Sequence, residues 1–309
     1  MPTHHRPTLS HSIQNLLSQD TAKLASSLAL EASSARIEVQ CLLQTALHVP
    51  RVYLLAHPEY CLSVAELIHY NELLQRRLNG EPIAYILGER EFFGMTFKVT
   101  PATLIPRPDT ELLVELALQR LPASESCAVL DLGTGSGAIA LAIAHARPQD
   151  EVLACDASAS ALAVAQENAR ALGLPGVKFV QSNWFAALGD QRFNLIVSNP
   201  PYIAAGDPHM AQGDVCFEPV SALVSGEDGL DDIRHIISQS ATHLLAGGCL
   251  LLEHGYDQAE RVRSLLQEAG FDAVLSARDL AGIERASGGR MGFERCRLTD
   301  SEAISRIPE

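Results

Sequence analysis

The segment Ser198-Asn199-Pro200-Pro201-Tyr202 carries the groups needed to bind a planar amino group. It follows an apolar run ending in Leu-Ile-Val, which predicts that the segment leaves the end of a strand. Consecutive prolines fix the backbone and remove two N–H donors, so the backbone offers carbonyl oxygens. Asn199 adds a side-chain carbonyl, and Tyr202 adds an aromatic face. Two acceptors match the two N–H donors of a planar –NH₂ group, and we interpret the segment as a site for such a nitrogen rather than a plain turn after a strand.

A glycine-rich segment upstream, Gly133-Thr134-Gly135-Ser136-Gly137, lies between a predicted strand and a predicted helix. Glycines there permit a tight turn and allow backbone N–H groups to approach a ligand closely. The spacing is G-x-G-x-G and not the G-x-G-x-x-G of dinucleotide folds. Taken alone, the segment is also compatible with a sharp turn that binds nothing.

Asp156 ends the next predicted strand, 19 residues after Gly137. A carboxylate at the carboxyl edge of a parallel sheet can accept hydrogen bonds from ribose hydroxyls, although it could instead cap the following helix. Together with the glycine loop it indicates an adenosine-type ligand, which leaves nicotinamide cofactors and S-adenosylmethionine open. The segment from Ser198 to Tyr202 favours S-adenosylmethionine.

The elements that position these residues alternate between strand and helix from Cys127 onward, a pattern typical of a parallel sheet covered on both faces. Strands are predicted at 128–131, 151–155, 177–181, 194–198, 249–253, 271–277 and 292–298. Helices are predicted at 109–121, from the glycine loop to 147, and at 158–172, 230–245 and 257–269. A long irregular stretch over 199–226 interrupts the alternation, and we interpret residues 203–226 as a loop that contacts the substrate.

The first part of the chain has a helical pattern from Ser12 to Asn79. Ser63 and Glu66 form a predicted capping box for a helix that stops at Gly80. A short β-hairpin is predicted over 91–99, followed by a stiff proline-rich connector. The predicted organisation is a tail at 1–11, a helical domain at 12–80, a hairpin and linker at 81–108, a catalytic domain at 109–298 and a tail at 299–309.

Composition limits the function classes. Apolar residues make up 47% of the 309 residues and the formal net charge is −14, which argues for a folded chain and against non-specific binding of nucleic acid. No apolar stretch approaches the roughly 20 residues of a membrane span, and the N-terminal residues do not resemble a secretory signal. The seven cysteines lack C-x-x-C spacing. We therefore expect a cytoplasmic protein with free thiols, no metal site and no membrane contact.

Several segments resemble the HemK-type release factor glutamine methyltransferases, one branch of the protein-(glutamine-N5) methyltransferases. The resemblance covers residues 12 to 285, and the matching segments are 80–88, 91–94, 104–111, 131–137, 198–202 and 217–219. It implies an α/β fold: a seven-stranded Rossmann-like S-adenosylmethionine-dependent methyltransferase domain, preceded by a small N-terminal helical bundle for substrate recognition and a β-hairpin linker.

The resemblance also implies an activity, which is N5-methylation of the glutamine in the Gly-Gly-Gln motif of bacterial class I peptide chain release factors. It implies that Gly133 to Gly137 line the methionine and ribose part of S-adenosyl-L-methionine, that Asp156 holds the ribose hydroxyls, and that Asn199 contributes to the cofactor site. It further implies that Asn199, Pro200, Pro201 and Tyr202 bind the glutamine amide. Trp184 would lie beside the adenine, or be a core residue after a strand.

The sequence departs from the family pattern at Asn183, where an acidic residue is frequent, and between Asp279 and Met291. Arg107 and Glu111 could steer the substrate or form an exposed ion pair at a helix start. Three other functions compete: methylation of a glutamine in a large-subunit ribosomal protein, amino-methylation of DNA, and an inactive scaffold for release factors. The acidic charge disfavours DNA, and the intact glycine loop, Asp156 and Asn199 disfavour the scaffold.

Overall fold

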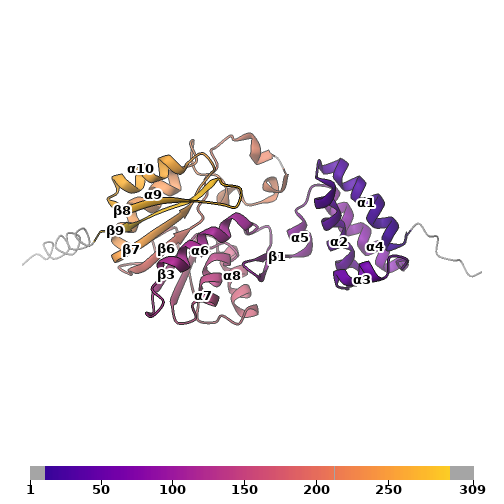
Figure 1. Ribbon diagram of the computed structural model, residues 1–309, viewed down its shortest axis with the longest axis horizontal. Coiled ribbons are helices and arrows are strands. Elements are labelled where there is room, and N and C mark those ends of the chain that lie inside the picture. The colour runs from indigo at the N-terminus through magenta and orange to yellow at the C-terminus, as the bar shows by residue number, and fades with distance from the viewer. Residues whose placement is uncertain (1–10, 212, 293–309) are drawn as a thin grey trace, which may run out of the picture. The chain divides into compact units, whose positions relative to one another are not determined.

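The structure, a computed structural model, describes residues 11–211 and 213–292, which divide into two compact units (Figure 1). The smaller unit contains the described residues up to Gly88 together with His209–Phe217. The larger unit contains Glu89–Pro208 and the described residues from Glu218 onward. The tails predicted at 1–11 and 299–309 lie, apart from His11, outside the described residues.

The smaller unit is helical, as the sequence predicts. Its helices are α1 (Ile13–Leu28), α2 (Ala32–Leu47), α3 (Arg51–Ala56), α4 (Val64–Leu78) and α5 (Ile83–Leu87). The capping box at the start of α4 is confirmed, because Ser63 Oγ accepts from Glu66 N and Glu66 Oε2 accepts from Ser63 N. Apolar side chains such as Leu42 and Tyr70 are fully buried and form the core of this unit.

A second segment, His209–Phe217, completes the smaller unit although it follows the Ser198–Tyr202 segment in the chain. It includes the short 3-10 helix η4 (Gly213–Phe217), and residues of another, η3 (Pro208–Ala211). Asp214 Oδ1 lies 3.4 Å from Arg77 Nη1 of α4, and the Phe217 ring lies against Gly80. The loop predicted at 203–226 therefore has its tip in the helical unit.

The larger unit opens with the predicted hairpin, β1 (Glu89–Phe92) and β2 (Met95–Lys98), and continues into a seven-stranded sheet. The strands of that sheet are β3 (Ala128–Leu132), β4 (Glu151–Asp156), β5 (Lys178–Gln181), β6 (Phe193–Ser198), β7 (Leu244–Glu253), β8 (Phe271–Arg278) and β9 (Glu284–Met291). Their order is β5-β4-β3-β6-β7-β9-β8, and β9 pairs antiparallel with both of its neighbours while the other pairs are parallel. This confirms the α/β methyltransferase fold with seven strands.

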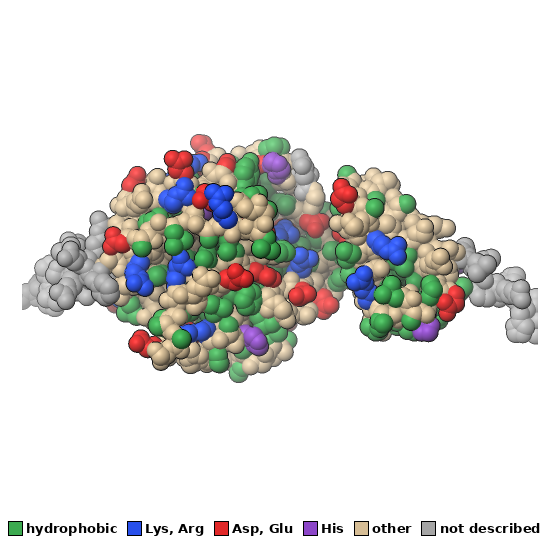
Figure 2. Space-filling model, in the orientation of Figure 1, with side chains coloured by type: hydrophobic (Ala, Val, Ile, Leu, Met, Phe, Trp, Pro, Cys, Tyr) green, Lys and Arg blue, Asp and Glu red, His purple; other side chains and the backbone are tan. Residues whose placement is uncertain are grey.

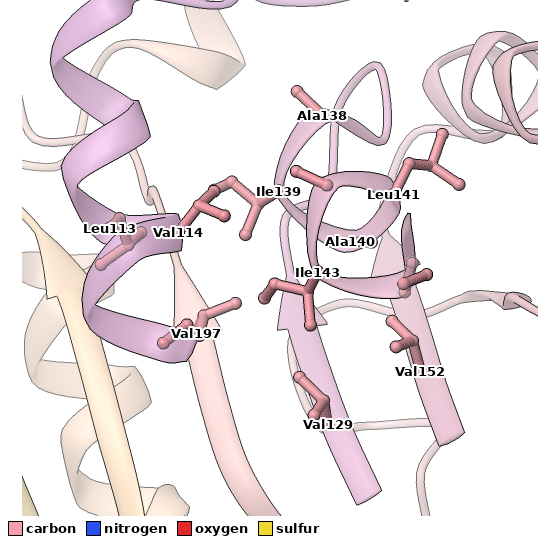
Figure 3. Close-up of a cluster of buried hydrophobic side chains, with 14 of the residues drawn as sticks. Leu113, Val114, Val129, Ala138, Ile139, Ala140, Leu141, Ile143, Val152 and Val197 are labelled. Atoms are coloured by element: carbon pink, nitrogen blue, oxygen red, sulfur yellow. The ribbon is translucent and has the colours of Figure 1, made fainter. Parts of the chain in front are cut away.

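Helices cover both faces of the sheet because successive strand residues point to opposite faces. The helices of this unit are α6 (Glu111–Arg120), α7 (Ala138–Ala146), α8 (Ala159–Ala171), α9 (Asp231–His243) and α10 (Ala259–Glu268), with the 3-10 turns η2 (Pro108–Thr110) and η5 (Val220–Ala222). Figure 3 shows Ile139 and Ile143 of α7 packed with Val114 of α6 over Val129 and Val197 of the sheet. The neighbouring strand residues Leu130 and Ile196 pack on the other face with α9 and α10.

The C-terminal strands differ from the prediction. Residues 284–291 form β9, whereas the sequence predicts a strand at 292–298, of which only Gly292 is among the described residues. The run Ser287-Gly288-Gly289 has little intrinsic strand preference, so this strand escapes a pattern search. Its place comes from pairing with β7 and β8, a tertiary effect.

No helix among residues 11–211 and 213–292 is both long and apolar enough to cross a membrane. On the face drawn in Figure 2, acidic and basic side chains of the larger unit are interspersed and do not form one continuous basic surface.

Gly137 provides a test of the close packing between the glycine loop and its surroundings. It has φ +86°, and a Cβ there would lie 3.0 Å from Leu141 Cδ1 and 3.2 Å from Ala165 Cβ. Gly137→Ala should lower the free energy of unfolding by about 1–3 kcal/mol through overpacking, in addition to about 1 kcal/mol for the left-handed backbone. Urea unfolding followed by the fluorescence of Trp184, the single tryptophan, measures the larger unit.

The matched control is Gly173→Ala, because Gly173 has φ +70° but no atom within 4 Å of the added Cβ. The difference between the two variants isolates the steric contribution. Equal losses of stability in both would contradict the packing argument.

Candidate functional site

The site lies where the strand order of the sheet reverses, between β3 and β6. Both strands are parallel, and their register pairs Leu132 with Ser198. Ser198 Oγ donates to the Leu132 carbonyl at 2.7 Å, which ties the two strand ends together. In open α/β sheets such a reversal opens a crevice at the carboxyl edge. The glycine loop after β3 and the Asn199 segment after β6 therefore leave the sheet side by side.

A side chain at the first position of the glycine loop would be crowded and would need a left-handed backbone. Gly133 has φ +71°, and a Cβ on it would lie 3.3 Å from Cζ3 of the Trp184 ring. The N–H groups of Gly133 and Thr134 both donate to the Cys155 carbonyl at 2.9 Å. These contacts fold the loop back over the end of β4, the strand that carries Asp156.

Asp156 holds the loop from the neighbouring strand end. Its Oδ2 accepts from Gly135 N at 2.9 Å and its Oδ1 accepts from Ser158 N at 2.8 Å. The sequence also allowed Asp156 to cap the following helix. The cap of α8 is instead Ser158, whose side chain accepts from Ala161 N. An ionised carboxylate has about four lone-pair sites, so each oxygen of Asp156 can accept a further hydrogen bond.

A pocket of about 530 Å³ connects these parts, and all of its lining residues belong to the larger unit. The predicted site residues that line it are Gly133, Thr134, Gly135, Ser136, Asp156, Trp184, Asn199 and Pro201. The other predicted residues, Gly137, Pro200 and Tyr202, are not among the residues that line it. Lining residues that the sequence does not single out include Pro101 and Pro106 from the linker, Thr110 from η2, and Pro219 and Ala222 from the loop.

Asn199 stands at the wall of this pocket with a defined amide orientation. Its Nδ2 donates to Thr110 Oγ1 at 3.3 Å. The amide nitrogen is thereby used, and Oδ1 remains as an acceptor on a pocket-lining residue. Thr110 is buried, at 4% exposure, and makes no cap hydrogen bond to its own helix α6.

Trp184 combines the two roles that the sequence left open. The ring lines the pocket, and it also packs against the buried cluster on the α9 side of the sheet. Its Nε1 donates to Asp232 Oδ1 at 3.1 Å, which fixes the plane of the indole. The backbone of Trp184 has φ +50°, an uncommon value for a residue with a side chain. Strain of this kind persists where surrounding contacts over-determine the position.

Two buried carboxyl groups lie close to the functional segments. Asp131, at the end of β3, is fully buried, and burial raises its pKa to about 7 even though Thr134 and the backbone N–H of Ala140 donate to Oδ2. Glu253, at the end of β7, is 3% exposed, and burial raises its pKa to about 7. Neither carboxyl has a basic residue within ion-pair distance among the described residues.

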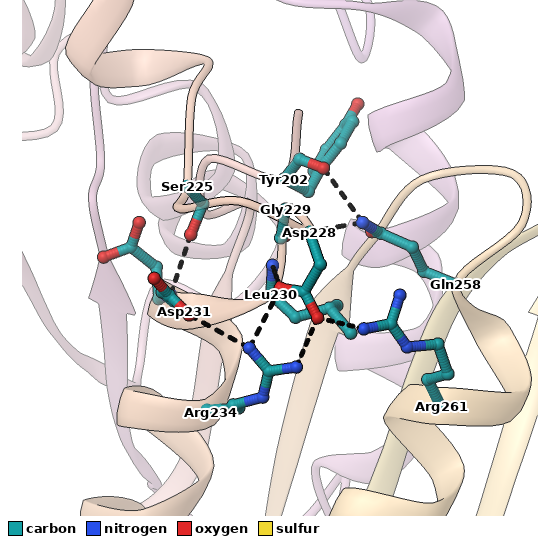
Figure 4. A network of polar contacts seen from close by, with 10 residues as sticks. Tyr202, Ser225, Asp228, Gly229, Leu230, Asp231, Arg234, Gln258 and Arg261 are labelled. Carbon is teal, nitrogen blue, oxygen red and sulfur yellow. Dashed lines mark hydrogen bonds and ion pairs between the residues drawn. The ribbon is translucent and has the colours of Figure 1, made fainter. Parts of the chain in front are cut away.

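Tyr202 is held at both its side chain and its backbone. Its hydroxyl donates to Glu253 Oε1 at 3.3 Å, and burial raises the pKa of the phenol. Gln258 Nε2 donates to the Tyr202 carbonyl at 2.9 Å (Figure 4). Asp228 lies nearby between Arg234 and Arg261, and hydrogen bonds from Arg234 lower its pKa. This network fixes the segment that leads from the Tyr202 region into α9.

Arg107 and Glu111 do not form the ion pair considered from the sequence. Arg107 Nη2 pairs with Glu218 Oε1, a carboxylate whose side chain is fully buried. Glu111 Oε1 accepts from the backbone N–H of Phe93 in the hairpin at 2.8 Å. The ion-pair interpretation was wrong because the chain brings a distant glutamate, 111 positions away, to Arg107. His254, which directly follows β7, is fully buried with contacts on both ring nitrogens.

Two family models match the chain. The first, described as a methyltransferase small domain, matches residues 109–220, and the second, described as a PrmC N-terminal domain, matches residues 20–88. The release factor glutamine methyltransferase of Pseudomonas aeruginosa is 51% identical over 260 residues, which cover 84% of this chain and 94% of that protein. The release factor glutamine methyltransferase of Escherichia coli K12 is 49% identical over 262 residues, with 84% and 94% covered.

Among solved structures, a methyltransferase from Pyrococcus furiosus is similar in fold. Its TM-score is 0.50 at 19% identity, and the match covers 72% of this chain and 99% of that chain. At this identity the match supports the fold of the sheet and its helices, and the site must be judged from its own residues.

The raised pKa of Asp131 predicts how stability changes with pH. The pKa rises from 3.8 to about 7 on folding, so protonated Asp131 favours the folded state. The contribution is fully present below the unfolded pKa and is lost as the pH rises toward 7. Asp131→Asn should remove this pH dependence. The free energy of unfolding of the variant minus that of the wild type should therefore increase as the pH rises from about 4 to 7.

Urea unfolding of both proteins across this pH range, read by Trp184 fluorescence, measures the difference. Glu253 titrates in both proteins and cancels in the comparison. Parallel pH profiles would show that Asp131 ionises normally in the folded state.

Proposed function

Because the chain belongs to the family of release factor glutamine methyltransferases, we propose that it methylates N5 of the glutamine in the Gly-Gly-Gln motif of bacterial class I peptide chain release factors. The enzyme is a protein-glutamine N5-methyltransferase that uses S-adenosyl-L-methionine. The observation that carries the proposal is the pocket shared by Asn199, the glycine loop and Asp156. This arrangement supports binding of a nitrogen that accepts the methyl group beside a site for a nucleoside.

The residues of the pocket fit S-adenosyl-L-methionine. Asp156 keeps acceptor capacity for two ribose hydroxyls after holding Gly135 and Ser158. A Cβ on Gly135 would meet no atom within 4 Å, so the loop is open at this point. Trp184 offers a ring whose plane is fixed by Asp232, and Asn183 lies next to it in the pocket wall. When bound, the cofactor supplies an electrophilic methyl group on a sulfonium.

The protein must overcome the weak nucleophilicity of an amide nitrogen, whose lone pair is delocalised into its carbonyl. In the proposed complex, Asn199 Oδ1 and the Pro200 carbonyl each accept one N–H of the glutamine amide. Both hydrogen bonds raise the electron density on nitrogen and direct it toward the methyl group. As nitrogen becomes positively charged during transfer, the same hydrogen bonds become charge-assisted and stronger.

Rigidity of the Asn199-Pro200-Pro201 backbone contributes to the rate. Two prolines leave few alternative conformations, and Ser198 anchors the segment to β3. Good alignment of reacting groups lowers barriers by several kcal/mol, about 7 in favourable cases. No strong general base is required, because a protonated, alkylated amide is acidic enough to release its proton to water.

The partner in this proposal is a release factor, recognised by the helical domain proposed at 12–80, and the place of the reaction is the cytoplasm, where release factors act. No direct contact with nucleic acid is part of the proposal, in keeping with the net charge of −14. The proposed residue roles are those given by the sequence: Gly133 to Gly137, Asp156, Trp184 and Asn199 for the cofactor, and Asn199 to Tyr202 for the substrate.

Methyl transfer to defined acceptors tests the function. A class I release factor, a large-subunit ribosomal protein and duplex DNA are each incubated with the enzyme and S-adenosylmethionine carrying a labelled methyl group. We expect label only in the release factor, with mass spectrometry of its peptides locating one methyl group on the glutamine of Gly-Gly-Gln. Label in either of the other acceptors alone, or in none, would overturn the proposal.

Asn199→Ala tests the amide-binding role directly. The variant loses one of the two acceptors, so turnover should fall on the order of 100-fold or more, by analogy with deletion of one oxyanion-hole donor. Steady-state methylation of a release factor measures the loss, and an unchanged thermal unfolding midpoint serves as the control for folding. Turnover close to that of the wild type would mean that the glutamine amide binds elsewhere.

A further inference from the structure

The segment from Ser198 to Tyr202 is anchored at its two ends. The two prolines within it have no N–H, so they cannot tie the backbone down by donating hydrogen bonds. At the first end, Ser198 Oγ donates to the Leu132 carbonyl at 2.7 Å. At the second end, the Tyr202 carbonyl accepts from Gln258 Nε2 at 2.9 Å. The position of Asn199 between these ends therefore depends on both anchors.

Gln258 is a buried residue whose side chain serves other segments than its own helix. It occupies the N-cap of α10 and is 6% exposed. Side chains at this position commonly accept a hydrogen bond from an N–H of the first helical turn. Gln258 makes no such bond to the N–H groups of α10, all of which belong to the described part of the chain. Figure 4 shows its amide directed instead at Tyr202 and Gly229.

The amide of Gln258 has one possible orientation. Its Oε1 accepts from Gly255 N at 2.8 Å, and its Nε2 donates to the carbonyls of Tyr202 at 2.9 Å and Gly229 at 3.4 Å. A backbone N–H only donates and a carbonyl only accepts, so a flipped amide would face three groups of its own kind. The side chain thus ties three backbone segments together in a single geometry.

The Gly255 end of this contact is fixed to the sheet. The Gly255 carbonyl accepts from His254 Nδ1 at 2.9 Å, and His254 directly follows β7. The backbone N–H of His254 donates to the Arg285 carbonyl of β9 at 2.9 Å. Gln258 therefore holds the Tyr202 carbonyl at a position that is defined by two strands of the sheet.

The Gly229 end of the contact leads to the other wall of the pocket. Gly229 has φ +75°, and a Cβ there would overlap the Tyr202 carbonyl oxygen and lie 2.8 Å from Gln258 Nε2. A glycine is needed for so close an approach. Three residues later in the chain, Asp232 Oδ1 accepts from Trp184 Nε1 at 3.1 Å. The turn at Gly229 is therefore the start of the segment that holds the indole ring.

We propose that Gln258 is a positioning residue for methyl transfer, which keeps the amide-binding segment aligned with the Trp184 wall by holding the Tyr202 and Gly229 carbonyls together. The inference rests on the proposed function, because this alignment matters only when a nitrogen bound at Asn199 must face a methyl group bound beside Trp184. Gln258 is not among the residues that line the pocket. Its effect on the reaction is transmitted through the backbone that it holds.

Two substitutions at position 258 test the proposal. Gln258→Glu keeps the acceptor for Gly255 N but places a carboxylate oxygen against the carbonyls of Tyr202 and Gly229. Gln258→Met keeps the length of the side chain and removes all three hydrogen bonds. We expect kcat to fall on the order of 10- to 100-fold in both, since a small misplacement of reacting groups has an effect of this size. The KM for a release factor and the Kd for S-adenosylmethionine should each change by less than about 3-fold, because no group that binds either reactant is removed.

Acidification should partly rescue the glutamate variant. Burial beside two carbonyls favours the neutral form of a carboxyl group, and its one O–H can donate to the Tyr202 carbonyl. The kcat of the wild type divided by that of Gln258→Glu should therefore decrease as the pH falls from about 8.5 to about 5.5. The same ratio for Gln258→Met should stay constant. A ratio for Gln258→Glu that does not change with pH would overturn the proposal.

The matched control is Gln267→Glu, the same substitution at an exposed position of α10, which should leave kcat unchanged. Thermal unfolding of each variant, read by Trp184 fluorescence, verifies the fold, and calorimetry measures the Kd for S-adenosylmethionine. An unaltered kcat in the folded Gln258 variants contradicts the proposal, and so does a Kd that weakens by the same factor as kcat. Failure of both Gln258 variants to fold would assign Gln258 to stability alone and would also overturn it.

The two proposals fail in different ways. A wild-type enzyme that methylates no release factor overturns the function itself. An active wild type whose kcat is unaffected by Gln258→Glu and by Gln258→Met overturns only the positioning role.

Discussion

The parallel pairing of β3 with β6 is the constraint on which the site depends. It aligns Leu132 with Ser198, and the Ser198 hydroxyl closes the junction by donating to the Leu132 carbonyl. A register shift of one residue would turn the side chains of β6 to the opposite faces of the sheet. Because Val197 and Ile196 belong to separate buried clusters on the two faces, such a shift is strongly opposed. The core thus sets the distance between the glycine loop and Asn199.

Around this junction, the acceptor segment is held by contacts that converge from distant parts of the chain. Thr110 contacts Asn199 from the start of α6. Glu253 contacts Tyr202 from the end of β7, and Gln258 contacts the Tyr202 backbone from the start of α10. Each contact holds a different group of the segment, and Asn199 Oδ1 is left without a hydrogen-bond partner among the described residues. A site built in this way is organised before its ligands bind, which is the condition for effective electrostatic stabilisation.

The loop after Tyr202 has parts in both units. Its two ends meet at an isolated bridge between Ile203 and Val224 in the larger unit. His209–Phe217, in contrast, belongs to the helical unit through contacts that include Asp214 with Arg77. Arg77 is 4% exposed and also binds Glu38. The segment that would hold the substrate amide is therefore continuous, over a few residues, with a part of the helical unit, which gives the length of this loop a structural reason.

The sequence by itself determined the fold and those site residues that a local sequence pattern identifies. Helical periodicity, the Ser63–Glu66 capping box, strand–helix alternation, the glycine loop, Asp156 and the Asn199–Tyr202 segment are all properties of neighbouring residues, so they can be read without coordinates. The terminal strand β9 was missed, because a glycine-rich run gains its strand conformation only from its partners.

Only the tertiary structure decided which residues stand behind the site. In the sequence, Glu253 is the polar end of an apolar strand, Thr110 is a helix start and Arg107 is part of a local ion pair. No local pattern predicts that Glu253 contacts Tyr202, that Thr110 contacts Asn199 or that Arg107 pairs with Glu218. Their partners come from 51 to 111 positions away. Hydrogen bonds at such separations depend on strand order and register, which a pattern of neighbouring residues does not encode, and this is why the orientation of Asn199 became visible only in the folded chain.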